Sequence, residues 1–275
     1  MRDGVQSWEE RDMNRFAIGH VLIKSKQLQQ TVRDYEKLGF TVTYRTDPAK
    51  AHNALIYLRD GSFLELFNPK PFQLPDKLFL GLLRLIRPLK PILIDRYISY
   101  IKSDEGMNDY ALDSVLPEQA ADNLRDIIRA GAKIGKKISM SKKLQDGRKQ
   151  TWWMAMPQAI EFPFFMSPYT PAVTCTEHEI THSNGVLGID TLVIDVPELE
   201  EWIMKYKVIL DGASVSRQGR QCEFILGKKH KIVLRQAERY RLSEIHLLTS
   251  VPNLLSGQEF VQEKNRCLSI VNKQG

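Results

Sequence analysis

Two polar side chains interrupt apolar stretches in the first quarter of this 275-residue chain. His20 lies within FAIGHVLIK and Glu65 within FLELF, and both stretches have the composition of strands. An unpaired charge inside an apolar strand is costly. A histidine nitrogen and a carboxylate on neighbouring strands could together hold a divalent metal, or Glu65 could act as the base in a proton transfer. A hydrogen-bonded histidine in a cavity is the alternative for His20.

The residues around His20 and Glu65 predict a strand, an amphipathic helix at about 26–38, and three further strands, the first of them at 41–46. Asp60-Gly61 is a strong signal for a hairpin between strands at 52–58 and 63–67. If these two residues form the whole loop, Ile56 faces Glu65, and His52 lies on the same face of the sheet. His52 then becomes a third candidate for the site, although it could also only cap the hairpin.

The same order of elements recurs twice further along the chain, so the sequence contains an internal βαβββ repeat. Helices at 117–130 and 197–207 are each preceded by a strand and followed by strand-like segments. When the copies are aligned on their helices, His20, Asp109 and Thr191 take comparable positions, and a shift of one residue would replace Asp109 by Tyr110. We therefore expect an α/β (α+β) protein.

The first copy resembles the vicinal oxygen chelate superfamily, which contains glyoxalases, bleomycin resistance proteins and dioxygenases, and within it the glyoxalase-like domain branch. The resemblance rests on Gly19-His20-Val21, on YEKLGF at 35–40, on HNAL at 52–55 and on Leu64-Glu65-Leu66. It implies two paired modules at 14–70 and 106–170, whose mixed sheets together form a cup. They make one domain at 14–172 with a helical insert at 71–105. Residues 1–13 would be a flexible leader, 173–185 a linker, and 186–275 a third βαβββ-like module with extra C-terminal strands.

The resemblance also implies a site. Members of this superfamily hold a divalent metal in the cup with residues from the first and last strand of each module. The matching positions here are His20 and Glu65 in the first module, and Asp109 and Ser167 in the second. Ser167 departs from the usual glutamate, and the third copy offers only Thr191 and Leu234. A His20, Glu65 and Asp109 set would suit Zn, Mn, Fe(II) or Ni.

Two functions follow from the resemblance. One is a metal-dependent lyase or dioxygenase that acts on a small substrate with vicinal oxygens, with Glu65 and His52 as the catalytic candidates. The other is a metal-free protein that sequesters a small molecule in the same cup. Neither needs a nucleotide cofactor, and the chain could work as a monomer or a homodimer.

Composition and charge limit the kinds of partner and the cellular location that we expect. The net charge of +6 comes from interleaved charges, and no nucleic-acid motif occurs, so we expect no nucleic-acid partner. Three scattered cysteines without a CxxC pair indicate no disulfide framework, which favours the cytoplasm. No uninterrupted apolar run reaches the length of a transmembrane helix.

Two segments carry competing interpretations. The sequence KLFLGLLRLIRPLKPILI at 77–94 is either an insert that packs its leucines on the protein, or a basic amphipathic surface, extending to about residue 100, that contacts a membrane or partner. Residues 178–182 read His-Glu-Ile-Thr-His, a formal zinc-protease motif that requires a helix. Because no helical apolar period surrounds it, we interpret it as a linker or edge strand.

Overall fold

The computed structural model describes residues 14–70, 74–144 and 146–250, and the backbone of two strands at 259–261 and 267–270. The predicted leader at 1–13 lies outside the described residues. The strands in the first half of the chain are β1 (Phe16–Lys24), β2 (Asn53–Tyr57), β3 (Phe63–Phe67), β4 (Gly106–Ser114), β5 (Ile138–Lys143), β6 (Lys149–Ala155) and β7 (Phe164–Met166). Those in the second half are β8 (Val186–Val196), β9 (Ser214–Gln218), β10 (Gln221–Ile225), β11 (Lys231–Gln236), β12 (Arg241–Thr249), β13 (Glu259–Val261) and β14 (Cys267–Ile270). The helices are α1 (Leu28–Lys37), α2 (Asp76–Ile86), α3 (Pro91–Lys102), α4 (Ala120–Arg129) and α5 (Leu199–Ile209).

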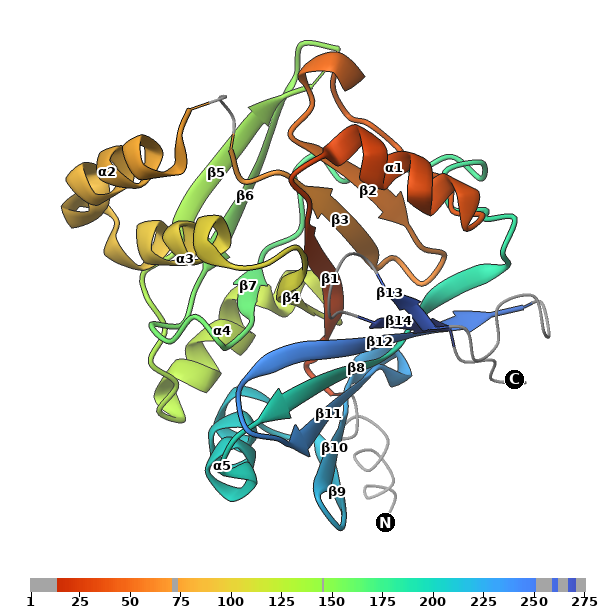
Figure 1. Ribbon diagram of the computed structural model, residues 1–275. Coiled ribbons are helices and arrows are strands. Elements are labelled where there is room, and N and C mark those ends of the chain that lie inside the picture. Colours follow the sequence, from red (N-terminus) through yellow and green to blue (C-terminus); the bar gives the residue numbers. More distant parts are fainter. Residues whose placement is uncertain (1–13, 71–73, 145, 251–258, 262–266, 271–275) are drawn as a thin grey trace, which may run out of the picture.

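The described strands form two mixed sheets of seven strands each (Figure 1). The first sheet has the order β2-β3-β1-β4-β7-β6-β5, and the second has the order β13-β14-β12-β8-β11-β10-β9. At the centre of the first sheet, β1 and β4, the first strands of the first two units, pair antiparallel. At the centre of the second sheet, β8, the first strand of the third unit, pairs antiparallel with β12. The prediction of tandem βαβββ units in cupped mixed sheets is therefore confirmed, and β12 and β14 extend the sheet of the third unit.

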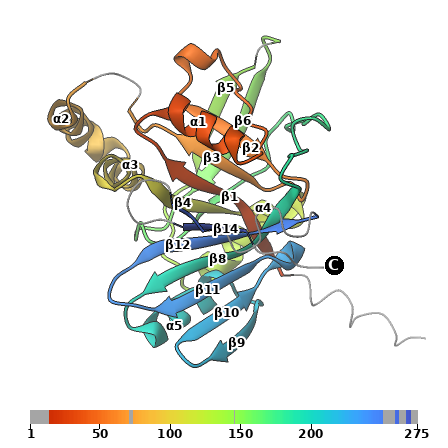
Figure 2. The same ribbon diagram turned by 45° about the vertical axis from the view of Figure 1, so that its right-hand side comes forward.

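The two sheets lie next to each other (Figure 2), and one hydrophobic core joins them. It takes apolar side chains from the inner face of the first sheet, from the second sheet and from α5. Tyr110 of β4 and Tyr206 of α5 meet there, with their hydroxyl oxygens 2.7 Å apart. Because this face of the first sheet is committed to packing, only its opposite, hollow face is left for a site.

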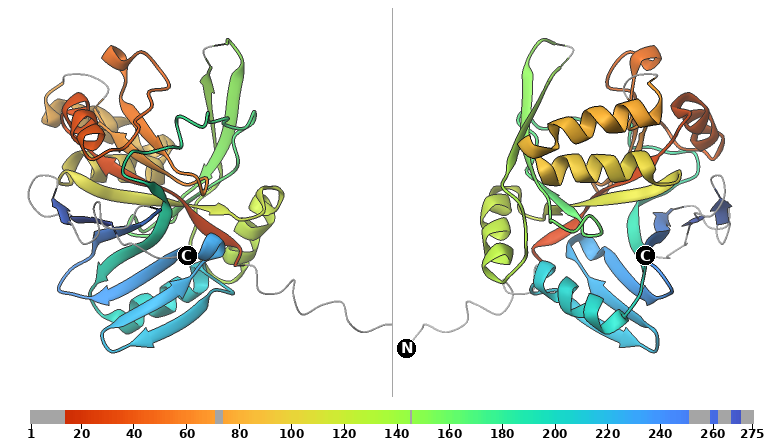
Figure 3. Two further views of the ribbon diagram at one scale, coloured as in Figure 1. Left: turned by 90° about the vertical axis from the view of Figure 1, so that its right-hand side faces the viewer. Right: turned by 60° about the vertical axis from the view of Figure 1, so that its left-hand side comes forward.

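The insert between the modules is a pair of helices that lies on the hollow face of the first sheet (Figure 3). α3 packs Tyr100 against Phe67 and Leu22, whereas α2 lies outside α3 and contacts it through Phe79 and Leu83. The insert thus covers one end of the hollow. Within the described residues, no helix combines the length and apolar character needed to cross a bilayer.

Two local expectations were wrong. The segment predicted as a strand at 41–46 makes only a single bridge, between Thr43 and Leu55. The β2–β3 hairpin has a longer turn than Asp60-Gly61 alone, since Tyr57 pairs with Phe63 and Leu55 pairs with Glu65. This shift by one residue turns Ile56 into the core and places Leu55, not Ile56, opposite Glu65.

The physical reason for the longer turn is a contact with the third module. The Asp60 carboxylate accepts hydrogen bonds from the backbone and hydroxyl of Ser62 and from the backbone of Ile189, which belongs to β8. His230 also contacts this carboxylate, with Nε2 and Oδ2 3.1 Å apart. These contacts hold Asp60 in the longer turn.

Candidate functional site

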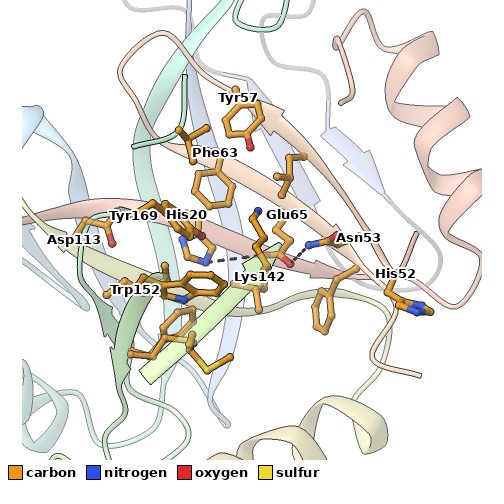
Figure 4. Close-up of a pocket in the computed structure, with 18 of the residues that line it drawn as sticks. His20, His52, Asn53, Tyr57, Phe63, Glu65, Asp113, Lys142, Trp152 and Tyr169 are labelled. Atoms are coloured by element: carbon orange, nitrogen blue, oxygen red, sulfur yellow. Dashed lines mark hydrogen bonds and ion pairs between the residues drawn. The ribbon is translucent and has the colours of Figure 1, made fainter. Parts of the chain in front are cut away.

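A cavity of about 730 Å³ occupies the hollow face of the first sheet (Figure 4). This volume is in the range of small-molecule sites, which lie at about 300–1,000 Å³. Its walls are rich in aromatic and sulfur-containing side chains, which include Tyr57, Phe63, Phe67, Tyr97, Tyr100, Trp152, Phe164, Tyr169, Met140, Met154, Met156 and Met166. Such walls suit an apolar, planar ligand.

His20 lies on β1 at the floor of this cavity, and its side chain is only 4% exposed. Phe63 stacks on the imidazole with ring centres 4.3 Å apart, and Phe164 meets it edge-on at 5.3 Å. Burial lowers the pKa of His20 to about 3, so the ring is neutral at pH 7. Its buried Nδ1 has no hydrogen-bond partner among the described residues.

Glu65 enters the same cavity from β3, as the sequence predicted (Figure 4). Its Oε2 lies 3.9 Å from Nε2 of His20, too far for a hydrogen bond. Asn53 of β2 donates a hydrogen bond of 2.8 Å to Oε1. Burial raises the pKa of Glu65, while Asn53 and the Lys142 ammonium oppose that rise.

His52 lies at the edge of the cavity and is exposed to solvent (Figure 4). The hairpin register explains its position, because Asn53 rather than His52 shares the face of Glu65. The residue that sequence reasoning missed here is therefore Asn53, which sits in the predicted HNAL motif one position further on.

Asp109 is on the hollow face of β4, but the insert neutralises it. Arg96 of α3 places Nη1 3.2 Å from its carboxylate, and the Tyr100 hydroxyl donates a hydrogen bond to it. Both charged side chains are almost fully buried, at 1% and 3% exposure. Arg96 also donates to the carbonyl of Phe162 at 2.6 Å. Asp109 is thereby engaged by a fixed guanidinium rather than by His20 and Glu65.

The strand register identifies the position that corresponds to Glu65 in the second module. Leu22 of β1 pairs with Glu65 of β3, and Ala111 of β4 pairs with Phe164 of β7. His20 and Asp109 each lie two residues before Leu22 and Ala111, so the equivalent of Glu65 is Phe164.

The alignment that put Ser167 at this position was wrong. Ser167 lies just past β7, and its hydroxyl accepts a hydrogen bond from the backbone of Trp153 and donates one to the carbonyl of Pro168. β7 has only three residues, which left the sequence pattern without an internal register mark.

These positions decide whether the residues fit a divalent metal of the kind the resemblance implies. His20 and Glu65 supply one half of a donor set, but the other half consists of an aspartate paired with Arg96 and an apolar Phe164. No group of three or more His, Cys, Asp or Glu side chains within the described residues is arranged to hold a metal ion. The donor set is therefore incomplete and does not fit the metal.

Asp113 is a further site residue that the sequence analysis did not single out. It lines the cavity from β4, and its buried Oδ1 has no hydrogen-bond partner among the described residues. Burial raises its pKa to about 6. Gly19 makes room for it, because a Cβ at that position would lie 2.4 Å from the Asp113 carboxylate. The sequence signal for Asp113 is Gly19, the residue beside His20, because only a residue without Cβ leaves space for this carboxylate.

The His-Glu-Ile-Thr-His segment is a linker with a structural role, as expected. Residues 177–180 form a turn rather than a helix. His182 accepts a hydrogen bond from the Thr41 backbone at 3.0 Å and donates one to the Tyr57 carbonyl at 2.9 Å. It thus ties the linker to the first module and has no free nitrogen for zinc.

Solved structures with the same fold are numerous, but sequence identity to them is low. A hypothetical protein from Staphylococcus aureus aligns with a TM-score of 0.67 at 13% identity, over 94% of this chain and 100% of that one. A Mn(II)-bound glyoxalase from Novosphingobium aromaticivorans aligns at 0.57 and 10% identity, over 95% and 82%. An extradiol ring-cleaving dioxygenase from B. fuscum aligns at 0.53 and 10% identity, over 96% and 73%. At these identities the likeness concerns the fold.

Sequence comparison gives the family. No curated protein matches the chain. The family described as "glyoxalase-like domain" matches residues 18–210, which include His20, Glu65, the helical insert and the second module. The chain belongs to the glyoxalase-like domain family, as its sequence motifs predicted.

Proposed function

We propose that this protein binds a small aromatic molecule in its cup without a metal. The observation that carries the proposal is the second half of the site, where Arg96 neutralises Asp109 and Phe164 stands in the position of the second carboxylate. The buried Arg96 guanidinium already supplies the positive charge beside Asp109 that a metal ion would otherwise supply. The cup that remains is apolar and of ligand size.

Two kinds of contact would select the ligand. Trp152 and Tyr169 meet edge to face with ring centres 5.0 Å apart and give an aromatic wall. The unpartnered Oδ1 of Asp113 accepts hydrogen bonds, and the unpartnered Nδ1 of the neutral His20 can accept or donate one. A planar ring that carries a hydroxyl or N–H group would satisfy both kinds of contact.

A binding experiment with a matched pair of probes tests this proposal. We expect 1-naphthol to bind saturably in isothermal titration calorimetry, and naphthalene, which lacks the hydroxyl, to bind at least tenfold more weakly because a buried polar group stays unpaired. Trp152→Ala should weaken both probes. Equal affinities for the two probes, or no saturable binding of either, would contradict the proposal.

A second candidate is metal-free proton transfer in the same cup, with Glu65 as the base. Its raised pKa and its position near Lys142 support this role. Deuterium exchange into the CH₂ next to the carbonyl of bound 1-tetralone, a bicyclic aromatic ketone of similar size, followed by NMR in D₂O, would detect it, because a base must remove that C–H proton before deuterium from the solvent replaces it. Glu65→Gln should abolish the exchange but keep binding. Whether the chain acts as a monomer or a homodimer stays a prediction.

A further inference from the structure

The outer surface of the helical insert is the most apolar exposed region of the described chain. Among the residues that the structure describes, nine large hydrophobic side chains are exposed. Five of them fall between residues 78 and 89: Leu78, Leu82, Leu85, Ile86 and Leu89. Leu85 is 77% exposed and Leu89 is 81% exposed. We call these five residues the leucine face. Such a concentration on one element marks an interaction surface.

Helical geometry makes the leucine face continuous. Leu78, Leu82 and Leu85 follow the i, i+4, i+7 spacing of one helix stripe. Phe79 and Leu83 point the other way and pack against α3. Because α2 lies outermost, with α3 between it and the first sheet, no other described element covers the stripe (Figure 1).

Positive charge surrounds the leucine face. Lys77 and Arg84 are seven residues apart and therefore flank one side of the stripe, and Lys90 follows Leu89 directly. All three are exposed, and none forms an ion pair within the described part of the chain. The acidic side chains Asp76 and Asp95 of the two helices are instead neutralised, by Lys70 and by Arg87.

A second basic segment adjoins the same edge. Lys136 and Lys137 lie in the segment that leads into β5, and they line a surface hollow together with Leu89 and Lys90. The leucine face therefore has basic side chains along its flank and at its end, and the Lys137 ammonium also lies 4.9 Å from the centre of the Trp153 ring.

We propose that the leucine face docks this protein on the surface of an anionic lipid bilayer. The arrangement of an apolar stripe with a basic rim is the pattern of helices that lie in the plane of the membrane interface. Charge complementarity favours this occupant over a second copy of the chain, whose identical basic rim would repel it. Since α3 of the same insert lines the cup with Tyr97 and Tyr100, docking places the cup next to the lipid.

Vesicle flotation with the full chain tests this inference. Vesicles of phosphatidylcholine with roughly a third of phosphatidylserine should carry the protein upward, and pure phosphatidylcholine should not, because each basic side chain near an anionic surface strengthens binding about fivefold. Binding should fall as salt rises from about 0.05 to 0.5 M. Leu85→Ser with Leu89→Ser, and separately Lys77→Glu with Arg84→Glu, should each weaken binding at least tenfold.

A matched control removes exposed apolar surface elsewhere. Met204→Ser with Val215→Ser changes two exposed side chains, 63% and 40% exposed, on α5 and β9, and should leave flotation unchanged. Equal flotation on both vesicle types, or equal loss in the control, would overturn the inference. So would a dimer, seen by sedimentation without vesicles, that the Leu85→Ser and Leu89→Ser variant dissociates, because the leucine face would then be covered by a second copy.

Discussion

Replacement of Arg96 by methionine would test the feature that separates this cup from a metal site. The buried guanidinium lies 3.2 Å from the Asp109 carboxylate. At an effective dielectric constant of 20, two unit charges at that distance attract by about 5 kcal/mol. Removal of one partner of a buried ion pair commonly costs about 3–5 kcal/mol, because the other charge stays buried and unpaired.

We therefore expect Arg96→Met to lower the free energy of unfolding in urea by about 3–5 kcal/mol at pH 7. Asp109→Asn combined with Arg96→Met should recover most of that loss, because the orphaned charge is removed as well. Circular dichroism and tryptophan fluorescence would follow unfolding of the parent, both single variants and the double variant. A loss below about 1 kcal/mol, or additive losses in the double variant, would refute the reasoning.

Three further predictions concern the cup. Arg96→Ala combined with Phe164→Glu should create affinity for Mn(II) or Zn(II), measured by calorimetry, because it frees Asp109 and restores a second carboxylate; the same result with Arg96→Ala alone would show that Phe164 does not block the site. Burial raises the pKa of Asp113 from the ordinary 3.8 to about 6. The Asp113 carboxyl therefore contributes to folding stability below pH 4, and this contribution is lost as the pH rises through 6. Urea unfolding should therefore show Asp113→Asn gaining up to ~3 kcal/mol relative to the parent between pH 4 and pH 8, and a constant difference would contradict this. Gly19→Ala should destabilise the protein by about 1–3 kcal/mol in urea unfolding, because its Cβ would meet the Asp113 carboxylate at 2.4 Å, and Asp113→Ala should rescue it; a neutral Gly19→Ala would be the contrary outcome.

The fold was predictable because its signals are local and repeated. Each βαβββ unit carries its own apolar periodicity, and three approximate copies supported one another. His20 and Glu65 were predictable for the same reason, since a polar residue inside an apolar strand stands out without any knowledge of its neighbours. The structure brings these two side chains within 3.9 Å of each other.

The errors came from contacts between distant segments. The prediction of the β2–β3 turn rests on Asp60-Gly61 alone, but the carboxylate of Asp60 accepts a hydrogen bond from the backbone of Ile189 in the third module. That contact lengthens the turn and moves His52 away from Glu65.

The second half of the site was hidden for a related reason. Asp109 has the position predicted for it on the hollow face, but no pattern in the sequence places Arg96 of the insert against it. The three-residue strand β7 was too short to fix its register by alternation, so Ser167 was chosen in place of Phe164. In both cases the missing information was tertiary packing on the hollow face.

Metal content is the most direct test of the central claim, that the cup works without a metal. The protein would be expressed in medium supplemented with zinc, manganese, iron and nickel, purified without chelators and measured by inductively coupled plasma mass spectrometry beside His20→Ala. We predict that neither protein carries a stoichiometric metal and that the two contents are equal. One metal ion per chain in the parent, lost in His20→Ala, would contradict the account.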